Sequence, residues 1–210
     1  MTCQTQKLLI EGAVGELEIS LTCPKNNSEP DTYAIVCHPH PLHGGTMDNK
    51  VVYMIASTLT MLNVGVVRFN FRGVGKSEGQ FDQGDGEVKD LHAVANWLDM
   101  TLYPQHIWLA GFSFGSYIAL RAHQDLQAER LLLVAPAVQR FDFSKLYTTE
   151  IPTLIIQGDQ DEVVSPDDVR KWVNAQKIMP QFKELQGVDH FFHGQLKTLR
   201  DTIINAWQAS

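Results

Sequence analysis

The stretch AGFSFG, residues 110–115, decides the fold because it places a serine between two glycines where the hydrophobic pattern changes. The apolar run 107–110 precedes it, and the helix-like run 117–122 follows it. A Gly-x-Ser-x-Gly turn between a buried strand and a helix holds its serine in a strained conformation at the carboxyl end of a sheet. The pattern therefore predicts Ser113 as a nucleophile exposed on a strand-to-helix turn.

Other apolar runs predict the sheet around this turn. Continuous runs lie at residues 33–37, 64–71, 131–135 and 153–156, and a last strand is expected at 182–185. Continuous runs are typical of strands buried on both faces, as in a parallel sheet. Alternating apolar and polar residues at 7–10 and 15–23 instead predict two half-buried antiparallel strands at a sheet edge.

Helix-like segments separate the predicted strands. They lie at residues 49–62, 86–99, 116–127, 166–177 and 193–208. Strand alternating with helix indicates a doubly wound α/β fold. We expect one domain over residues 1–210, with a mostly parallel eight-stranded sheet and helices on both faces.

Composition limits the partners and the setting. The net charge is −7 and no Lys/Arg cluster is present, which argues against nucleic acid and favours a small neutral or positively charged partner. No apolar run reaches membrane-spanning length, so no membrane association is expected. The three widely spaced cysteines Cys3, Cys23 and Cys37 form neither a disulfide framework nor a metal-knuckle pattern. We expect a cytoplasmic protein.

The chain resembles the α/β-hydrolase superfamily, in particular its small lidless esterases and dienelactone-hydrolase-like proteins. Five stretches carry the resemblance: VCHPHPLHGGTMDNKVV, VVRFNFRGVGKSEG, LAGFSFGSYIAL, IQGDQDEVVSP and GVDHFFHG. They span nearly the whole chain. They are specific for the superfamily and say little about the substrate.

The resemblance implies a base and an acid for Ser113, in the chain order Ser, Asp or Glu, His. The family pattern Gly-x-x-Asp-x-x-Val matches Asp161 and leaves Asp159 as a turn residue that caps local amides. The base is expected in the loop after the last strand, which selects His190. His193 is expected in the first turn of the final helix.

The resemblance also implies an oxyanion hole. One donor is the backbone N–H of Phe114, the residue after the nucleophile. The second is expected from the loop after strand 33–37, where Pro39 and Pro41 have no N–H to donate. Position in the pattern favours the His40 amide, with Leu42 as the alternative.

Two other patterns suggest different sites. His38, His40 and His43 could gather around a metal ion, but two prolines stiffen their loop and no carboxylate lies near, so no metal site is expected and His38 is interpreted as a structural anchor. The loop 71–79 contains Gly-x-Gly and a lysine but lacks phosphate-loop spacing. There we expect Arg72 to have a structural role beneath the turn.

The sequence thus predicts a serine hydrolase without a cofactor, acting as a monomer or homodimer on small carboxylic esters through an acyl-enzyme. The catalytic residues would be Ser113, Asp161 and His190. Thioesterase, lactone hydrolase and peptidase activities are alternatives on the same fold. A hydrolase-fold binding protein without turnover is the alternative outside enzymes.

Overall fold

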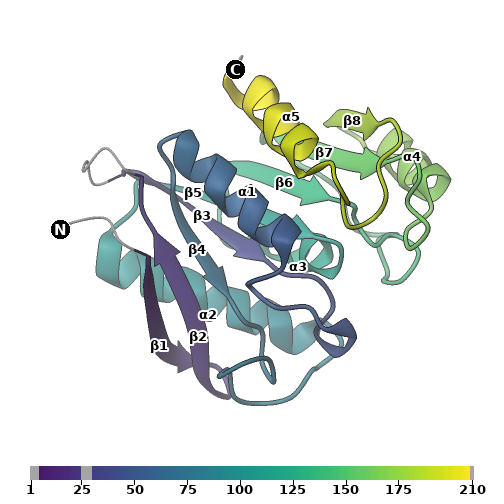
Figure 1. The fold of residues 1–210 in the computed structure, drawn as a ribbon. Helices are drawn as coiled ribbons and strands as arrows, with labels where there is room; N and C mark the ends of the chain where they lie inside the picture. Colours follow the sequence, from purple (N-terminus) through teal and green to yellow (C-terminus); the bar gives the residue numbers. More distant parts are fainter. Residues whose placement is uncertain (1–4, 25–29, 209–210) are drawn as a thin grey trace.

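A computed structural model describes residues 5–24 and 30–208, so Cys3 lies outside the described residues. Its centre is a sheet in the order β1-β2-β4-β3-β5-β6-β7-β8 (Figure 1). The strands are β1 (Gln6–Gly12), β2 (Gly15–Thr22), β3 (Thr32–Cys37), β4 (Gly65–Phe69), β5 (His106–Phe112), β6 (Arg130–Val134), β7 (Thr153–Gly158) and β8 (Gln181–Leu185). The predicted eight-stranded sheet is confirmed.

The pairing of the strands is mostly parallel. β1 pairs with β2 and β2 with β4 in antiparallel fashion, whereas every pair from β4 to β8 is parallel. The direction in which strands are added to the sheet reverses next to β3. The chain places β4 on one side of β3 and then adds β5 to β8 on the other side. Ligands of such sheets bind where the carboxyl ends flank this switch point.

Helices cover both faces of the sheet (Figure 1). They are α1 (Lys50–Met61), α2 (Asp85–Leu102), α3 (Phe114–Ala122), α4 (Pro166–Asn174) and α5 (Leu196–Gln208). One apolar core packs α2, α3 and α4 against one face, and the other packs α1 and α5 against the opposite face. Among the described residues, no helix is both long enough and apolar enough to cross a membrane.

Alternate side chains of the central strands feed these two cores. In β3, Ile35 and Cys37 join the α2/α3 core, whereas Ala34 and Val36 join the α1/α5 core. All four side chains have no exposed surface. Burial on both faces explains why these strands read as continuous apolar runs.

The start of the final helix differs from the prediction. α5 begins at Leu196, and His193 lies in a turn before it rather than in its first helical turn. Asp189 causes the delay, because its side chain accepts the His193 backbone N–H at 3.0 Å and contacts His193 Nδ1 at 2.7 Å. Gly194 follows with a φ of 70°, which a right-handed helix does not allow.

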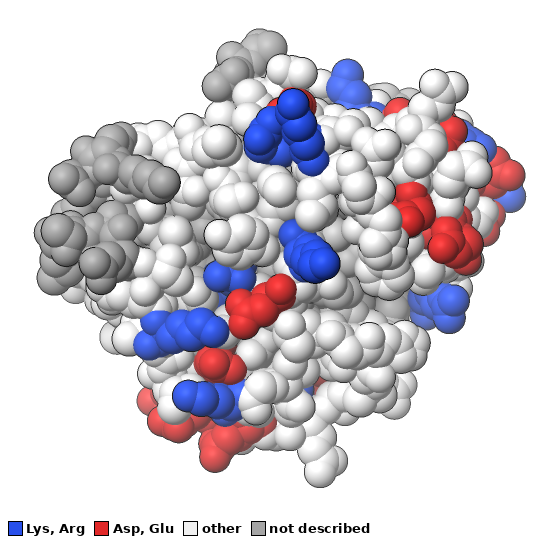
Figure 2. Space-filling model, in the orientation of Figure 1, with Lys and Arg blue, Asp and Glu red and all other residues white. Residues whose placement is uncertain are grey.

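Charge is dispersed on the face that carries α1 and α5. Figure 2 shows Lys and Arg scattered among uncharged side chains on this face, with Asp and Glu between them. Elsewhere in the described residues basic and acidic side chains also pair: Lys7 and Arg68 both contact Asp48, at 3.4 and 3.1 Å. This face therefore presents no continuous basic surface.

Candidate active site

Ser113 is the single residue between β5, which ends at Phe112, and α3, which begins at Phe114. Its φ of 54° and ψ of −115° are rare for a residue with a side chain. Such strain persists only where the surroundings enforce it, and it clusters at functional sites. The serine is 8% exposed and lines a pocket.

The two flanking glycines allow the turn because backbone approaches them closely. A Cβ on Gly111 would lie 2.2 Å from the carbonyl carbon of Gly115. A Cβ on Gly115 would lie 2.2 Å from the carbonyl oxygen of Cys37, at the end of β3. Only glycine fits at either position, so the turn packs directly against the neighbouring strand.

A second serine, Ser116, holds the turn from inside α3. The carbonyl of Val134 accepts the Ser113 N–H at 2.9 Å and lies 3.0 Å from the Ser116 hydroxyl. The same hydroxyl lies 2.8 Å from the carbonyl oxygen of Gly111. Ser116 has no exposed surface. Sequence reasoning did not single it out, since a serine in a helix is common and its role depends on contacts with β6.

Asp161 and His190 meet at the carboxyl edge of the sheet. Asp161 follows β7 and His190 follows β8, and Oδ2 of the aspartate lies 2.7 Å from Nδ1 of the imidazole. The two side chains are 0% and 3% exposed. A carboxylate accepting from Nδ1–H leaves Nε2 as the acceptor, which is the tautomer a general base requires.

Three further bonds fix the Asp161 carboxylate. Oδ1 accepts the backbone N–H groups of Val163 at 2.9 Å and Val164 at 2.7 Å. Oδ2 accepts Nε2 of Gln157 at 2.9 Å, beside its contact with His190. The sequence did not point to Gln157, which is buried at the end of β7. A polar residue in that apolar strand was the available signal.

Asp159 has a different role from Asp161. Its Oδ1 accepts the backbone N–H of Gly187 at 2.7 Å, so it ties the loop after β7 to the loop after β8. The contact spans 28 residues. Asp159 therefore does cap an amide, but not the local one that the sequence predicted.

Phe112 connects the predicted nucleophile, Ser113, to the predicted base, His190. The ring of His190 lies 5.0 Å from the ring of Phe112, the residue before Ser113. Within the described residues, the Ser113 hydroxyl makes no hydrogen bond to His190. Catalytic hydrogen bonds are often long in ligand-free structures and tighten when substrate binds.

The loop after β3 lies beside the start of α3. His40 precedes a short 3₁₀ helix, η1 (Pro41–His43), and its ring lies 5.3 Å from that of Phe114. The Leu42 N–H donates to His40 Nδ1 at 3.2 Å. The Leu42 amide is therefore already engaged. The His40 N–H donates to no acceptor among the described residues.

His38 anchors this loop. Its side chain is fully buried, with Nδ1 at 2.6 Å from the Pro39 carbonyl and Nε2 accepting the Phe71 N–H at 3.0 Å. Burial lowers the pKa of His38 to about 4. Both ring nitrogens are engaged, so neither is free for a metal. Among the described residues, no group of three or more His, Cys, Asp or Glu side chains is arranged to hold a metal ion.

Arg72 lies in the loop after β4 and forms a buried ion pair. Its guanidinium contacts Asp90 of α2 at 2.7 Å, and its backbone N–H donates to the same carboxylate at 3.0 Å. Hydrogen bonding to Asp90 raises the pKa of Arg72 above its usual value. The pair fixes the loop against α2, which agrees with a structural role.

A pocket of about 610 Å³ opens at Ser113, a size typical of small-molecule sites. Its lining comes from the loops after β3, β4, β6 and β7 and from the start of α3. The lining residues are His40, Leu42, His43, Phe81, Gln83, Ser113, Phe114, Ala137, Arg140, Phe141, Val163 and Val164. Predicted site residues Ser113, Phe114 and His40 thus share one pocket.

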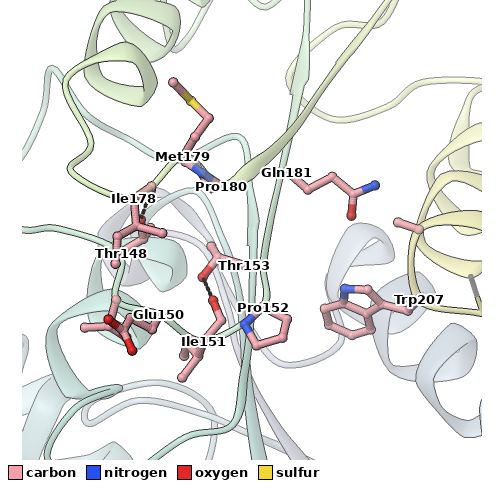
Figure 3. A pocket seen from close by; sticks show the side chains of 12 residues that line it. Thr148, Glu150, Ile151, Pro152, Thr153, Ile178, Met179, Pro180, Gln181 and Trp207 are labelled. Atoms are coloured by element: carbon pink, nitrogen blue, oxygen red, sulfur yellow. Dashed lines mark hydrogen bonds between the residues drawn. The ribbon is translucent and has the colours of Figure 1, made fainter. Parts of the chain in front are cut away.

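A second hollow, of about 240 Å³, lies at the opposite edge of the sheet (Figure 3). It is lined by the segments that enter β7 and β8 and by the end of α5, including Pro152, Pro180 and Trp207. None of the predicted site residues lines it. The carboxyl-edge pocket is therefore the candidate site.

The chain belongs to the α/β-hydrolase family, since the family model for the alpha/beta hydrolase domain matches residues 34–208. Two solved structures with nearly the same fold are described as α/β serine hydrolases. XC6422 of Xanthomonas campestris, described as lacking a lid, is 41% identical with a TM-score of 0.94, over 98% of this chain and 94% of its own. A homologue from Coxiella burnetii is 46% identical with a TM-score of 0.92, and the match covers 96% of this chain and 97% of the homologue.

A curated relative has also been found, RP471 of Rickettsia prowazekii. It is 42% identical over 169 residues, which cover 76% of this chain and 71% of the relative. The predicted superfamily and its lidless branch are confirmed. The chain is a member of the α/β serine hydrolases.

Proposed function

We propose that this protein is a carboxylesterase in which Ser113, His190 and Asp161 form the catalytic triad. The observation that carries the proposal is the strained turn at Ser113, which lines a pocket and follows Phe112, the residue whose ring contacts an imidazole held by a buried carboxylate. Backbone strain at a single residue costs stability, so its presence at Ser113 indicates a functional role. The three residues also follow one another in the family order Ser, Asp, His.

The reaction starts with attack of Ser113 Oγ on the ester carbonyl carbon while His190 Nε2 takes the serine proton. Asp161 holds the imidazole and stabilises the imidazolium that forms. The carbonyl oxygen becomes an oxyanion, which accepts from the backbone N–H groups of Phe114 and His40.

The tetrahedral intermediate then collapses. The bond to the alcohol oxygen breaks, and His190 returns its proton to that oxygen, so the alcohol leaves and an acyl-Ser113 remains. Water attacks the acyl-enzyme with His190 again as base. The carboxylic acid is released and Ser113 regains its proton.

Small esters are the substrates that the pocket favours. The segment between β6 and β7 supplies a wall through Ala137, Arg140 and Phe141, and it is too short to cover a long acyl chain. Leu42, in the loop after β3, is 69% exposed, and Arg140, in the segment between β6 and β7, is exposed as well. Both rims therefore border water.

Labelling and turnover test the proposal together. A fluorophosphonate probe should label the wild-type protein at Ser113, and p-nitrophenyl acetate to butyrate should be hydrolysed. Acyl thioesters, lactones and aminoacyl p-nitroanilides run in parallel separate the alternative hydrolase activities. Ser113→Ala should lose labelling and several orders of magnitude in kcat/KM while its thermal unfolding is unchanged. Near-normal turnover by that variant would reject the mechanism, and a folded wild type without labelling or turnover would favour a binding protein.

A further inference from the structure

The charge of the pocket is opposite to that of the chain. The chain carries a net charge of −7, yet none of the twelve pocket residues is acidic. One charged side chain lines it, Arg140, together with the imidazoles of His40 and His43. Global charge predicts a neutral or cationic ligand, but the groups that a bound ligand would contact favour an anion. Contacts at short range outweigh screened charges farther away.

Arg140 is an unusual arginine in this structure. Arg68, Arg72 and Arg121 each contact an aspartate, at 3.1, 2.7 and 2.8 Å. Among the described residues, no carboxylate lies within ion-pair distance of Arg140. His40 and Arg140 line the same pocket, and the charge of Arg140 contributes, after burial and His43, to lowering the pKa of His40.

A free guanidinium at a pocket wall matches one chemical group well. It presents five N–H donors in a planar fork, which pairs with the two oxygens of a carboxylate. Arg68, Arg72 and Arg121 already use guanidinium N–H groups on their own aspartates. Arg140 can offer it to a ligand.

Aromatic rings line part of the pocket. The ring of Phe114 lies 5.0 Å from that of Phe141, and the ring of His40 lies 4.8 Å from that of Phe81. Tyr117 stacks on Phe141 at 4.9 Å and 22°, which fixes the orientation of the Phe141 ring. Ring faces suit a flat apolar body between the reacting carbonyl and Arg140.

We propose that the preferred substrates are small esters that carry a free carboxylate on a short or flat body, with the carboxylate bound by Arg140. This inference rests on the proposed esterase activity of Ser113. The carboxylate takes no part in the bond changes, because ester and water still give a carboxylic acid and an alcohol. It contributes binding and orientation.

Two matched substrate pairs test the proposal. On the alcohol side, 4-acetoxybenzoate is compared with 4-acetoxybenzamide, which has nearly the same shape and no charge. On the acyl side, monoethyl succinate is compared with ethyl succinamate. In at least one pair, the wild-type kcat/KM should favour the anion by about fivefold, the upper range for an ion pair that borders water. Added salt should reduce this ratio.

Variants of Arg140 show whether this residue causes the preference for the anionic ester. Arg140→Gln should bring the ratio of the anionic to the neutral ester to about one, mainly by raising KM for the anion. Arg140→Lys should retain part of the preference, since it keeps the charge and loses the fork. Arg200→Gln on α5 is the matched control, because it removes the same charge from an arginine that pairs with Asp201 away from the pocket. Its ratio should equal that of the wild type.

The outcomes separate this inference from the proposed function. If wild type hydrolyses the neutral esters but does not prefer the anion in either pair, the carboxylate proposal is wrong and the esterase proposal stands. If Arg140→Gln lowers kcat for both members of a pair equally, Arg140 acts on the transition state and carboxylate recognition is again rejected. If none of the four esters reacts and fluorophosphonate does not label Ser113, the proposed function itself has failed.

Discussion

Oδ2 of Asp161 contacts Nδ1 of His190 at 2.7 Å, whereas Asp159, two residues earlier, accepts the backbone N–H of Gly187. The two carboxylates therefore have separate tasks, one on the imidazole and one on the loop behind it. Asp161 is buried by its partners, and Asp159 lies closer to the surface. This division can be tested with two equivalent substitutions.

Asp161→Asn should lower kcat/KM by about three to four orders of magnitude, because an amide at this position favours the wrong imidazole tautomer. Asp159→Asn should keep most of the activity and lower the free energy of unfolding by about 1 kcal/mol through its weakened bond to Gly187. Steady-state kinetics and urea unfolding of both variants check the pair. A larger kinetic loss in Asp159→Asn would show that the acid was assigned to the wrong residue.

The close contact between Gly115 and Cys37 predicts a second result. In Gly115→Ala the new Cβ would lie 2.2 Å from the Cys37 carbonyl oxygen, so the start of α3 must move away from β3. Overpacking of this kind costs about 1–3 kcal/mol. Because Phe114 and Ser113 move with α3, we also expect a loss of at least about tenfold in kcat/KM, since small displacements of catalytic groups are costly.

Gly194→Ala provides the control for this substitution. A Cβ there would meet no atom within 4 Å, although φ is 70°. The cost should be backbone strain of about 1 kcal/mol, with turnover close to that of wild type. Equal kinetic losses in the two glycine variants, at matched stability, would contradict the steric argument.

The parts of the site that depend on residues adjacent in the chain could be predicted from the sequence. The turn at Ser113 is local, because an apolar run, the Gly-x-Ser-x-Gly motif and a helical run follow one another directly in the sequence. Ser116 escaped prediction because its contact with Val134 joins α3 to β6, 18 residues away. Gln157 contacts Asp161 only four residues along the chain, and its sequence signal, a polar residue in an apolar strand, does not name the partner. Arg140 escaped for another reason. An arginine in a loop is usually solvated, and only the absence of a carboxylate partner among the described residues, together with the pocket beside it, makes it distinctive.

The final helix shows how a side chain overrides a pattern. Its apolar periodicity could begin at His193, but the Asp189 carboxylate captures the backbone N–H of that residue and the chain turns at Gly194. A local hydrogen bond of this kind competes with the helix ladder. The shift keeps His190 in a loop whose position is set by Asp161 and not by α5.

Burial of His38 predicts acid sensitivity. Its pKa is about 4 in the folded protein against 6.5 unperturbed, so the folded state binds fewer protons than the unfolded state between these values. Its contribution to stability is complete above about pH 6.5 and is lost as the pH falls toward 4, by about 3 kcal/mol in all. Urea unfolding from pH 7.5 to 4.5 measures this loss.

Two variants isolate the His38 contribution. His38→Gln should be less stable than wild type at pH 7.5 and should then lose about 2 kcal/mol less on acidification. His106→Gln is a control of opposite sign, because the hydrogen bond to Glu129 raises the pKa of His106. On acidification, His106→Gln should lose at least as much free energy of unfolding as wild type. The same acid slope in wild type and His38→Gln would assign the loss to other groups.

The exposure of the pocket rims predicts how activity depends on acyl chain length. A methylene that leaves water gains about 0.8 kcal/mol, which would raise kcat/KM about fourfold for each added carbon in a closed tunnel. Leu42 and Arg140 at the rims are exposed, so carbons that extend past the aromatic walls stay wet. With p-nitrophenyl esters from acetate to dodecanoate, kcat/KM should therefore be highest from acetyl to butyryl and should not rise beyond. The Ser113→Ala protein provides the blank for spontaneous hydrolysis at every length. A steady increase to dodecanoyl would require an enclosed acyl tunnel, and the small-ester proposal would then have to be withdrawn.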